Sequence, residues 1–208
     1  VIFYFKDDLV RLVQAWIPWN SQRNTEDFNL GLHLIVATMP IVLVGLIFSD
    51  VIAERTSSIE SIAWANLIFA GLLWFAFKYS PQTKNLVGLT VLAALAVGCL
   101  QALAIFPGAS RSGMAITGAL LIGLNLKESS KFAFLLSIPT ILGALILMVL
   151  KDAFVLTADD FMILLTGFIG SAIIAFLTIK VFLQFVEKIG MTPFVMYRLL
   201  LGLALLLL

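Results

Sequence analysis

The sequence has very little of what disulfide scaffolds, metal sites and soluble surfaces need. Its 208 residues include one cysteine and one histidine, which excludes an intrachain disulfide and argues against a His/Cys metal site. Only 12% of the residues are charged and the net charge is +1, so no electrostatic case exists for a nucleic-acid partner. Because soluble domains carry about a quarter charged residues, this composition also argues against an ordinary soluble domain.

Apolar residues are present in excess. They make up 62% of the chain, which is more than one soluble core can bury, so lipid must cover many of them. At about 20 residues per spanning helix, the chain has room for roughly six. The alternating pattern of a membrane β-barrel is absent. We therefore predict an all-α, polytopic membrane helix bundle, with apolar runs over residues 28–49, 61–77, 85–110, 132–150, 161–179 and 194–208.

Two polar stretches separate some of these runs. Residues 6–27 are predicted as a polar connection that touches the membrane interface through Trp16 and Trp19, and residues 180–193 as another. The chain begins at Val1 with neither an initiator methionine nor the pattern of a signal peptide. We expect residues 1–208 to form a single integral-membrane domain whose N-terminal part is missing.

One segment combines turn residues with hydrogen-bond donors. Pro107 and Gly108 break the preceding helix, and Ser110, Arg111 and Ser112 follow before Gly113. A guanidinium offers paired donors matched to phosphate oxygens, and the N-terminus of the next helix adds free N–H groups. An ionisable residue so isolated among apolar ones is a functional candidate. The segment therefore predicts an anion site inside the membrane.

Residues 112–126 are apolar but too short to cross a membrane, which predicts a re-entrant helix after the Ser-Arg-Ser-Gly loop. The alternative is a surface loop whose Arg111 reaches lipid headgroups.

Thr117 either adds a hydroxyl to the site or bonds its own backbone. Gln101 either faces the site or bonds a neighbouring helix. Tyr197 and Arg198 are interpreted as an interfacial anchor.

Residues 107–113 resemble the signature of the bacterial undecaprenyl-diphosphate phosphatases, the bacitracin-resistance proteins. Stretches similar to other parts of that family are Ala37–Phe48, Lys131–Thr140 and Pro193–Arg198. The resemblance implies a helical bundle with re-entrant helices in the bacterial plasma (inner) membrane. It also implies an enzyme that hydrolyses undecaprenyl diphosphate to undecaprenyl phosphate and phosphate. That reaction recycles the cell-wall lipid carrier and gives bacitracin resistance.

The resemblance also assigns roles to residues. Arg111 would grip the diphosphate and Ser110 would lie beside the attacked phosphate, as the catalytic pair, and the substrate-binding residues would be Gly108, Ser112, Gly113 and Thr117. The family's second motif, with glutamates and a histidine, has no match here and is expected before Val1. A divalent metal, expected to be Mg²⁺, would take its ligands from that segment, so no metal ligand is assigned in this chain, and residues 1–208 alone are expected to be inactive. Where the family often has a threonine, this sequence has Ala115.

The main alternative is a membrane transporter or flippase for an anionic lipid or a small anion, because broken helices suit that class equally well. Release of phosphate, as opposed to movement of intact substrate, distinguishes the two. The expected partners are a prenyl diphosphate lipid and membrane lipid, with no nucleic acid, and a homo-oligomer stays open. A lipid phosphatase with a downstream catalytic histidine fits poorly, because no histidine follows His33.

Overall fold

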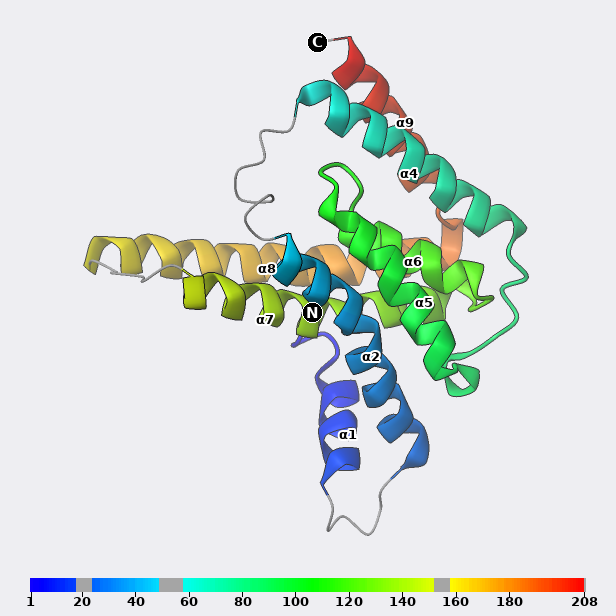
Figure 1. The fold of residues 1–208 in the computed structure, drawn as a ribbon, viewed down its shortest axis with the longest axis vertical. Coiled ribbons are helices and arrows are strands. Elements are labelled where there is room, and N and C mark those ends of the chain that lie inside the picture. The colour runs from blue at the N-terminus through cyan, green and yellow to red at the C-terminus, as the bar shows by residue number, and fades with distance from the viewer. Residues whose placement is uncertain (18–23, 49–57, 152–157, 208) are drawn as a thin grey trace.

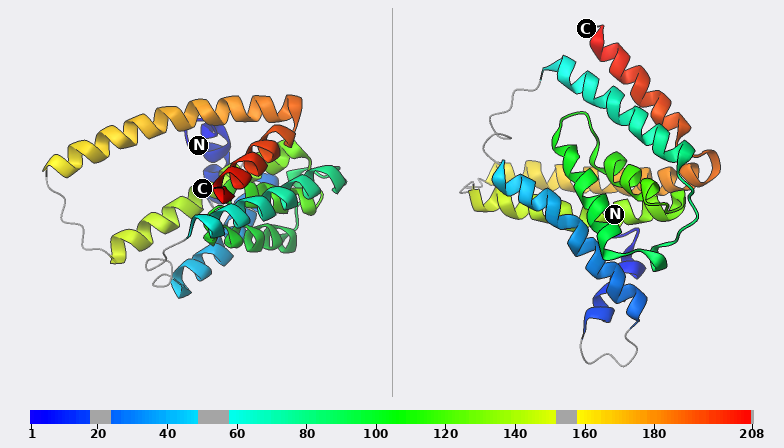
Figure 2. Two further views of the ribbon diagram at one scale, coloured as in Figure 1. Left: turned by 90° about the horizontal axis from the view of Figure 1, so that it is seen from above. Right: turned by 45° about the vertical axis from the view of Figure 1, so that its right-hand side comes forward.

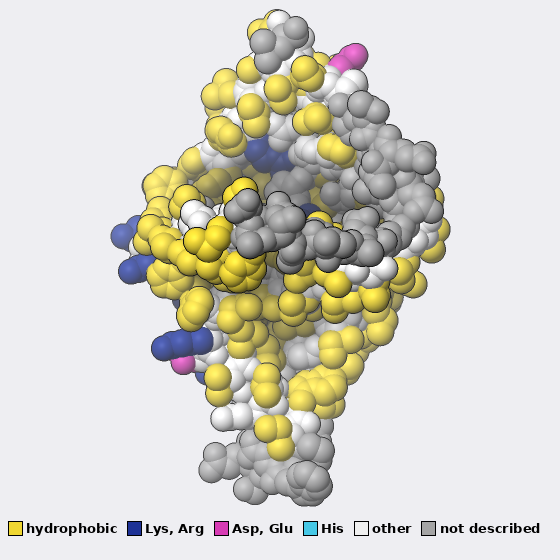
Figure 3. Space-filling view, turned by 90° about the vertical axis from the view of Figure 1, so that its left-hand side faces the viewer, with side chains coloured by type: hydrophobic (Ala, Val, Ile, Leu, Met, Phe, Trp, Pro, Cys, Tyr) yellow, Lys and Arg dark blue, Asp and Glu magenta, His cyan; other side chains and the backbone are white. Residues whose placement is uncertain are grey.

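Four long apolar helices form the frame of the protein. The computed structural model describes residues 1–17, 24–48, 58–151 and 158–207. The four helices are α2 (Thr25–Ile47), α4 (Ile59–Tyr79), α7 (Leu126–Lys151) and α8 (Ala158–Ile189). Each is long and apolar enough to cross a membrane, since about 20 residues span the hydrocarbon core. Apolar side chains also cover much of the face seen in Figure 3. The prediction of a polytopic membrane helix bundle is confirmed.

Two shorter helices lie side by side near the middle of the molecule (Figure 1). These are α5 (Val91–Ala102), which continues into the short helix η2 (Leu103–Ile105), and α6 (Arg111–Leu121). At 1.5 Å per residue α6 is only about 17 Å long, roughly half of the hydrocarbon thickness. The chain therefore enters along α5, turns at residues 106–110 and returns along α6. This is the re-entrant arrangement that the sequence predicts.

The two predicted polar connections are largely helical, so that part of the prediction is wrong. Helix α1 (Lys6–Trp16) buries Leu12 and Ala15, while most of its charged side chains stay exposed. Helix α8 continues to Ile189 and buries Val186, with charged residues on its outer side. In both segments the apolar residues recur at helical spacing, so charge on one face does not interrupt the helix. Trp19 lies outside the described residues.

Helix α9 (Thr192–Leu206) runs alongside α4 in both views of Figure 2. The two helices approach closely at Gly202, where a Cβ atom would lie 2.7 Å from side-chain atoms of Leu67. Helix α4 also contacts α6. This pair therefore borders the re-entrant hairpin on one side.

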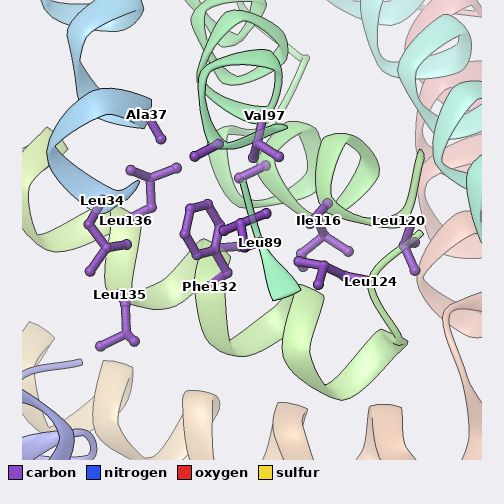
Figure 4. Packing of buried hydrophobic residues seen from close by; sticks show 14 of the residues in the cluster. Leu34, Ala37, Leu89, Val97, Ile116, Leu120, Leu124, Phe132, Leu135 and Leu136 are labelled. Atoms are coloured by element: carbon purple, nitrogen blue, oxygen red, sulfur yellow. The ribbon is translucent and has the colours of Figure 1, made fainter. Parts of the chain in front are cut away.

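The buried core holds the hairpin from the other side. Phe132 and Leu136 of α7 are fully buried and lie near Val97 of α5 and Ile116 of α6 (Figure 4). Helices α2 and α5 pack so closely that a Cβ atom on Gly98 would collide with the backbone of Ala37 in α2. Because interiors are close-packed, these contacts hold α5 and α6 firmly against α2 and α7.

Candidate functional site

The loop that joins η2 to α6 requires glycine at one position. Gly108 has a φ of +94°, in the left-handed region that favours glycine. A Cβ atom at Gly108 would lie 2.5 Å from the carbonyl oxygen of Ile62 in α4. The loop backbone therefore rests directly on α4, and no larger residue fits without displacing it.

Ser110 caps helix α6. Its Oγ accepts a hydrogen bond from the backbone N–H of Gly113 at 3.2 Å, and its φ is +69°. A non-glycine residue in this region costs on the order of 1–3 kcal/mol, which the surrounding packing must offset. The first intrahelical bond runs from Met114 N–H to the Ser110 carbonyl at 2.9 Å. The N–H groups of Arg111 and Ser112 precede that bond, so they are the free donors expected at a helix N-terminus.

Arg111 projects from this helix start. Its side chain is exposed, and no hydrogen bond or ion pair joins it to another of the described residues. It lines two cavities, one of about 190 Å³ and one of about 290 Å³. A guanidinium presents five donors and no acceptor. Arg111 therefore offers an unpaired positive charge where two cavities meet.

The smaller cavity is polar on one side. Its lining includes Gln101 and Thr140 as well as Arg111 and Ser112. The Thr140 hydroxyl donates to the Leu136 carbonyl at 2.8 Å, so its oxygen accepts from Gln101 Nε2 at 2.9 Å. This fixes the Gln101 amide with Oε1 as a buried acceptor that has no partner among the described residues. Both alternatives for Gln101 hold: it bonds a neighbouring helix and it faces the site.

Arg198 is a site residue that the sequence interpretation missed. It is only 9% exposed, and its Nη2 donates to the carbonyl oxygens of Gly108 at 2.7 Å and Ala109 at 3.1 Å. Its Nε donates to Asn66 Oδ1 at 2.8 Å, and Asn66 Nδ2 donates to the Arg198 carbonyl at 2.9 Å. Arg198 thus clamps the loop to α4 and α9, and its interpretation as an interfacial anchor is wrong. The signal that could have identified it is an arginine within an apolar helix, the argument applied to Arg111.

The Thr117 hydroxyl donates its proton to the helix backbone and not to a cavity. It is fully buried, and its Oγ1 donates to the Gly113 carbonyl one turn earlier at 2.7 Å. Gly113 is tightly enclosed, because a Cβ atom there would lie 3.0 Å from Nη1 of Arg198. The loop and α6 therefore bring together five of the six predicted site residues, with Thr117 one turn further into the helix. The chemical roles predicted for the six stay predictions.

The residues near Arg111 do not fit a divalent metal. No group of three or more His, Cys, Asp or Glu side chains suited to a metal ion occurs within the part of the chain that the structure describes. The lining of the smaller cavity supplies hydroxyls and an amide, whereas Mg²⁺ is usually held by carboxylates. The side chains around Arg111 therefore suit an anion better than a metal cation.

The sequence of this protein matches the model of a known protein family. A model of the family "Bacitracin resistance protein BacA" matches residues 1–204. The chain belongs to this family. The undecaprenyl-diphosphatase of Saccharophagus degradans is 42% identical to this chain over 205 residues, covering 97% of this chain and 76% of the relative.

Two further relatives carry the same name. The undecaprenyl-diphosphatase of Teredinibacter turnerae is 40% identical over 97% of this chain and 77% of its own length. That of Alcanivorax borkumensis is 40% identical over 99% of this chain and 78% of its own length. The match to the family, over residues 1–204, spans the loop, helices α5 and α6 and the position of Arg198.

Proposed function

We propose that this multi-pass membrane protein is an undecaprenyl-diphosphate phosphatase, which recycles the cell-wall lipid carrier and gives bacitracin resistance. The observation that carries the proposal is the unpaired guanidinium of Arg111 beside the N-terminus of a re-entrant helix. The names of relatives about 40% identical to this chain supply the substrate. An unpaired cation inside a membrane is energetically costly unless an anion pairs with it, and the diphosphate of a membrane lipid is such an anion.

The proposed reaction hydrolyses the phosphoanhydride. An oxygen of water bonds to the terminal phosphorus, and the bond from that phosphorus to the bridging oxygen breaks. The products are undecaprenyl phosphate, which keeps the bridging oxygen, and inorganic phosphate, which gains the oxygen and one proton of the water; the other proton is released. Such a transfer depends mainly on positioning and on stabilising negative charge. Arg111 supplies donors and positive charge to the phosphate oxygens, and the N–H groups of Arg111 and Ser112 supply further donors.

The other loop residues hold these donors in place. Ser110 caps helix α6 by accepting a hydrogen bond from Gly113 N–H, which leaves the N–H groups of Arg111 and Ser112 available to a phosphate. The bonds from Arg198 to the Gly108 and Ala109 carbonyls fix the loop from behind. Small displacements of positioning groups lower rates strongly, by as much as about 100-fold for 1 Å. Arg198 is therefore a positioning residue in this proposal, and Ser110 keeps its predicted place beside the attacked phosphate.

Two further statements belong to the proposal. Hydrolysis is expected to need a divalent metal, with Mg²⁺ the leading candidate, held by groups other than the described residues of this chain. The protein is expected in the bacterial plasma membrane, where the lipid carrier is used. The four helices suited to crossing a membrane support a membrane location in general.

The test uses the protein expressed from its complete gene and purified in detergent. Release of inorganic phosphate from undecaprenyl diphosphate is measured for the wild type, Arg111→Ala and Arg111→Lys. We expect Arg111→Ala to lose nearly all turnover and Arg111→Lys to recover little, since an ammonium lacks the paired donors. Arg11→Ala is the matched control, because Arg11 is an exposed arginine on α1 that pairs with Asp8; it should keep full activity.

Two results would contradict the proposal. Normal turnover by Arg111→Ala would remove Arg111 from the site. No phosphate release by a folded wild type, together with movement of intact substrate across proteoliposomes, would favour the transporter alternative.

A further inference from the structure

The smaller of the two cavities is lined by a residue with an unused hydrogen-bond acceptor. Gln101 of α5 is only 2% exposed, and its Oε1 has no hydrogen-bond partner among the residues that the structure describes. A buried acceptor without a partner costs free energy, and one explanation for such an atom is a catalytic role toward a bound molecule. Because Gln101 lines the same cavity as Arg111 and Ser112, that molecule would lie beside the proposed phosphate site.

Two hydrogen bonds fix the orientation of the Gln101 amide. The Thr140 hydroxyl donates its proton to the Leu136 carbonyl at 2.8 Å, so its oxygen can only accept from Gln101 Nε2, at 2.9 Å. A flipped amide would place Oε1 against an oxygen that has no proton left to donate. The two bonds therefore hold Oε1 in place as an acceptor before any reaction begins.

The lining of this cavity offers donors from α6 and acceptors from α5 and α7. Arg111 presents only donors. The Ser137 hydroxyl donates to the Phe134 carbonyl at 2.6 Å, so the Ser137 oxygen, like Gln101 Oε1, can only accept. An ionised phosphate oxygen has no proton to donate, so it suits the donors and is repelled by the acceptors. A water molecule suits an acceptor, and its oxygen remains free to attack phosphorus.

We propose that Gln101 Oε1 accepts a hydrogen bond from the attacking water and orients the water oxygen toward the terminal phosphorus. This inference rests on the proposed function and adds a catalytic residue to it. At about 190 Å³ the cavity has room for a water molecule, which occupies about 30 Å³ in the liquid, next to a phosphate group. The amide takes no proton: one proton stays with the water oxygen in inorganic phosphate, and the other is released. A glutamine amide orients the attacking water in this way in GTP hydrolysis.

The test separates the reaction from binding of the diphosphate. For each variant of the protein expressed from its complete gene, kcat is measured for phosphate release from undecaprenyl diphosphate. The dissociation constant is measured for a methylene-bridged analogue of that lipid, which cannot be hydrolysed. Gln101→Met removes the acceptor and keeps an unbranched side chain of similar length.

Thr140 acts through Gln101 and is therefore a positioning residue, so Thr140→Val is the second variant. Without the hydroxyl, Gln101 Nε2 loses its acceptor and the amide can rotate. Thr38→Val is the matched control, because Thr38 is also a buried threonine whose hydroxyl donates to its own helix, at 2.7 Å from the Leu34 carbonyl.

We expect Gln101→Met to lower kcat about tenfold, which corresponds to about 1.4 kcal/mol and so to one hydrogen bond. The dissociation constant of the analogue should change less than about twofold, since Oε1 does not touch the diphosphate. Thr140→Val should lower kcat about threefold, because a loosened amide still reaches the water part of the time. Added to Gln101→Met, it should cause no further loss, because its effect passes through the amide. Thr38→Val should leave both quantities unchanged.

Two results for a folded Gln101→Met would overturn the inference. One is an unchanged kcat. The other is a loss of affinity for the analogue as large as the loss of kcat, which would mean that Oε1 accepts from a protonated phosphate and not from water. If Gln101→Met does not fold, a normal kcat in Thr140→Val would overturn it. In each case phosphate release by the wild type leaves the proposed function standing, whereas a folded wild type that releases no phosphate would refute the proposed function and this inference with it.

Discussion

Replacing Arg198 is the most informative perturbation of the loop. Its guanidinium donates to Asn66 Oδ1, to the Gly108 carbonyl and to the Ala109 carbonyl at 2.7–3.1 Å, and the residue is nearly buried. A buried acceptor left without a partner costs about 1–3 kcal/mol. Arg198→Ala strands two loop carbonyls, so we expect it to lower the free energy of unfolding by about 2–6 kcal/mol.

Arg198→Lys is the more diagnostic variant because it keeps the positive charge. An ammonium has no fork of donors, so it cannot bond the loop and Asn66 together. Losing one or two charge-assisted bonds at about 1.5–3 kcal/mol each should lower the melting temperature in detergent measurably. Because the loop carries Arg111, we expect kcat for phosphate release to fall at least about tenfold, consistent with the cost of small displacements.

The assay combines phosphate release with thermal unfolding of the same preparations, at a temperature where all variants are folded. Arg11→Lys serves as the control, since Arg11 lies exposed on α1. Asn66→Leu removes the partner of Nε and should give a smaller loss in the same direction. If Arg198→Lys melts like the wild type and turns over normally, the clamp is not what holds the loop.

Three further expectations concern the same site. Gly108→Ala should abolish most activity and lower the melting temperature, because the φ of +94° at Gly108 and the nearby Ile62 carbonyl leave no room for a methyl group. Gly71→Ala is the control. A Gly108→Ala variant with unchanged activity and melting temperature would refute this account of the loop. Gln101→Leu should lower kcat up to about tenfold, the equivalent of one hydrogen bond from the attacking water to Gln101 Oε1. Unfolding should change little, since the Thr140 hydroxyl keeps its bond to the Leu136 carbonyl. Unchanged kinetics would show that Oε1 has no role. Treatment with EDTA should stop phosphate release and added Mg²⁺ should restore it, whereas full activity in EDTA would reject the metal requirement.

The spanning helices could be predicted from the sequence because their signal is local. The run predicted over residues 28–49 corresponds to Thr25–Ile47, and that over 61–77 to Ile59–Tyr79. Helix ends were less predictable, since capping by Asn24 and Ser58 extends both helices into polar sequence. The amphipathic α1 was missed because its charged residues were interpreted as a connection, although one face is apolar.

The candidate site divides in the same way. Pro107, Gly108 and the isolated Arg111 were enough to predict a broken helix, a short re-entrant helix and an anion site, since each acts through its own backbone or charge. The clamp joins Arg198 and Asn66, which are separated by 132 residues, and the Gln101–Thr140 bond joins residues 39 apart. Runs that are apolar on every side do not indicate which face meets which helix. The sequence by itself therefore determined the helices, the break and the charge, while only the packing of α2, α4, α7 and α9 around the hairpin decided what holds the loop and where the cavities open.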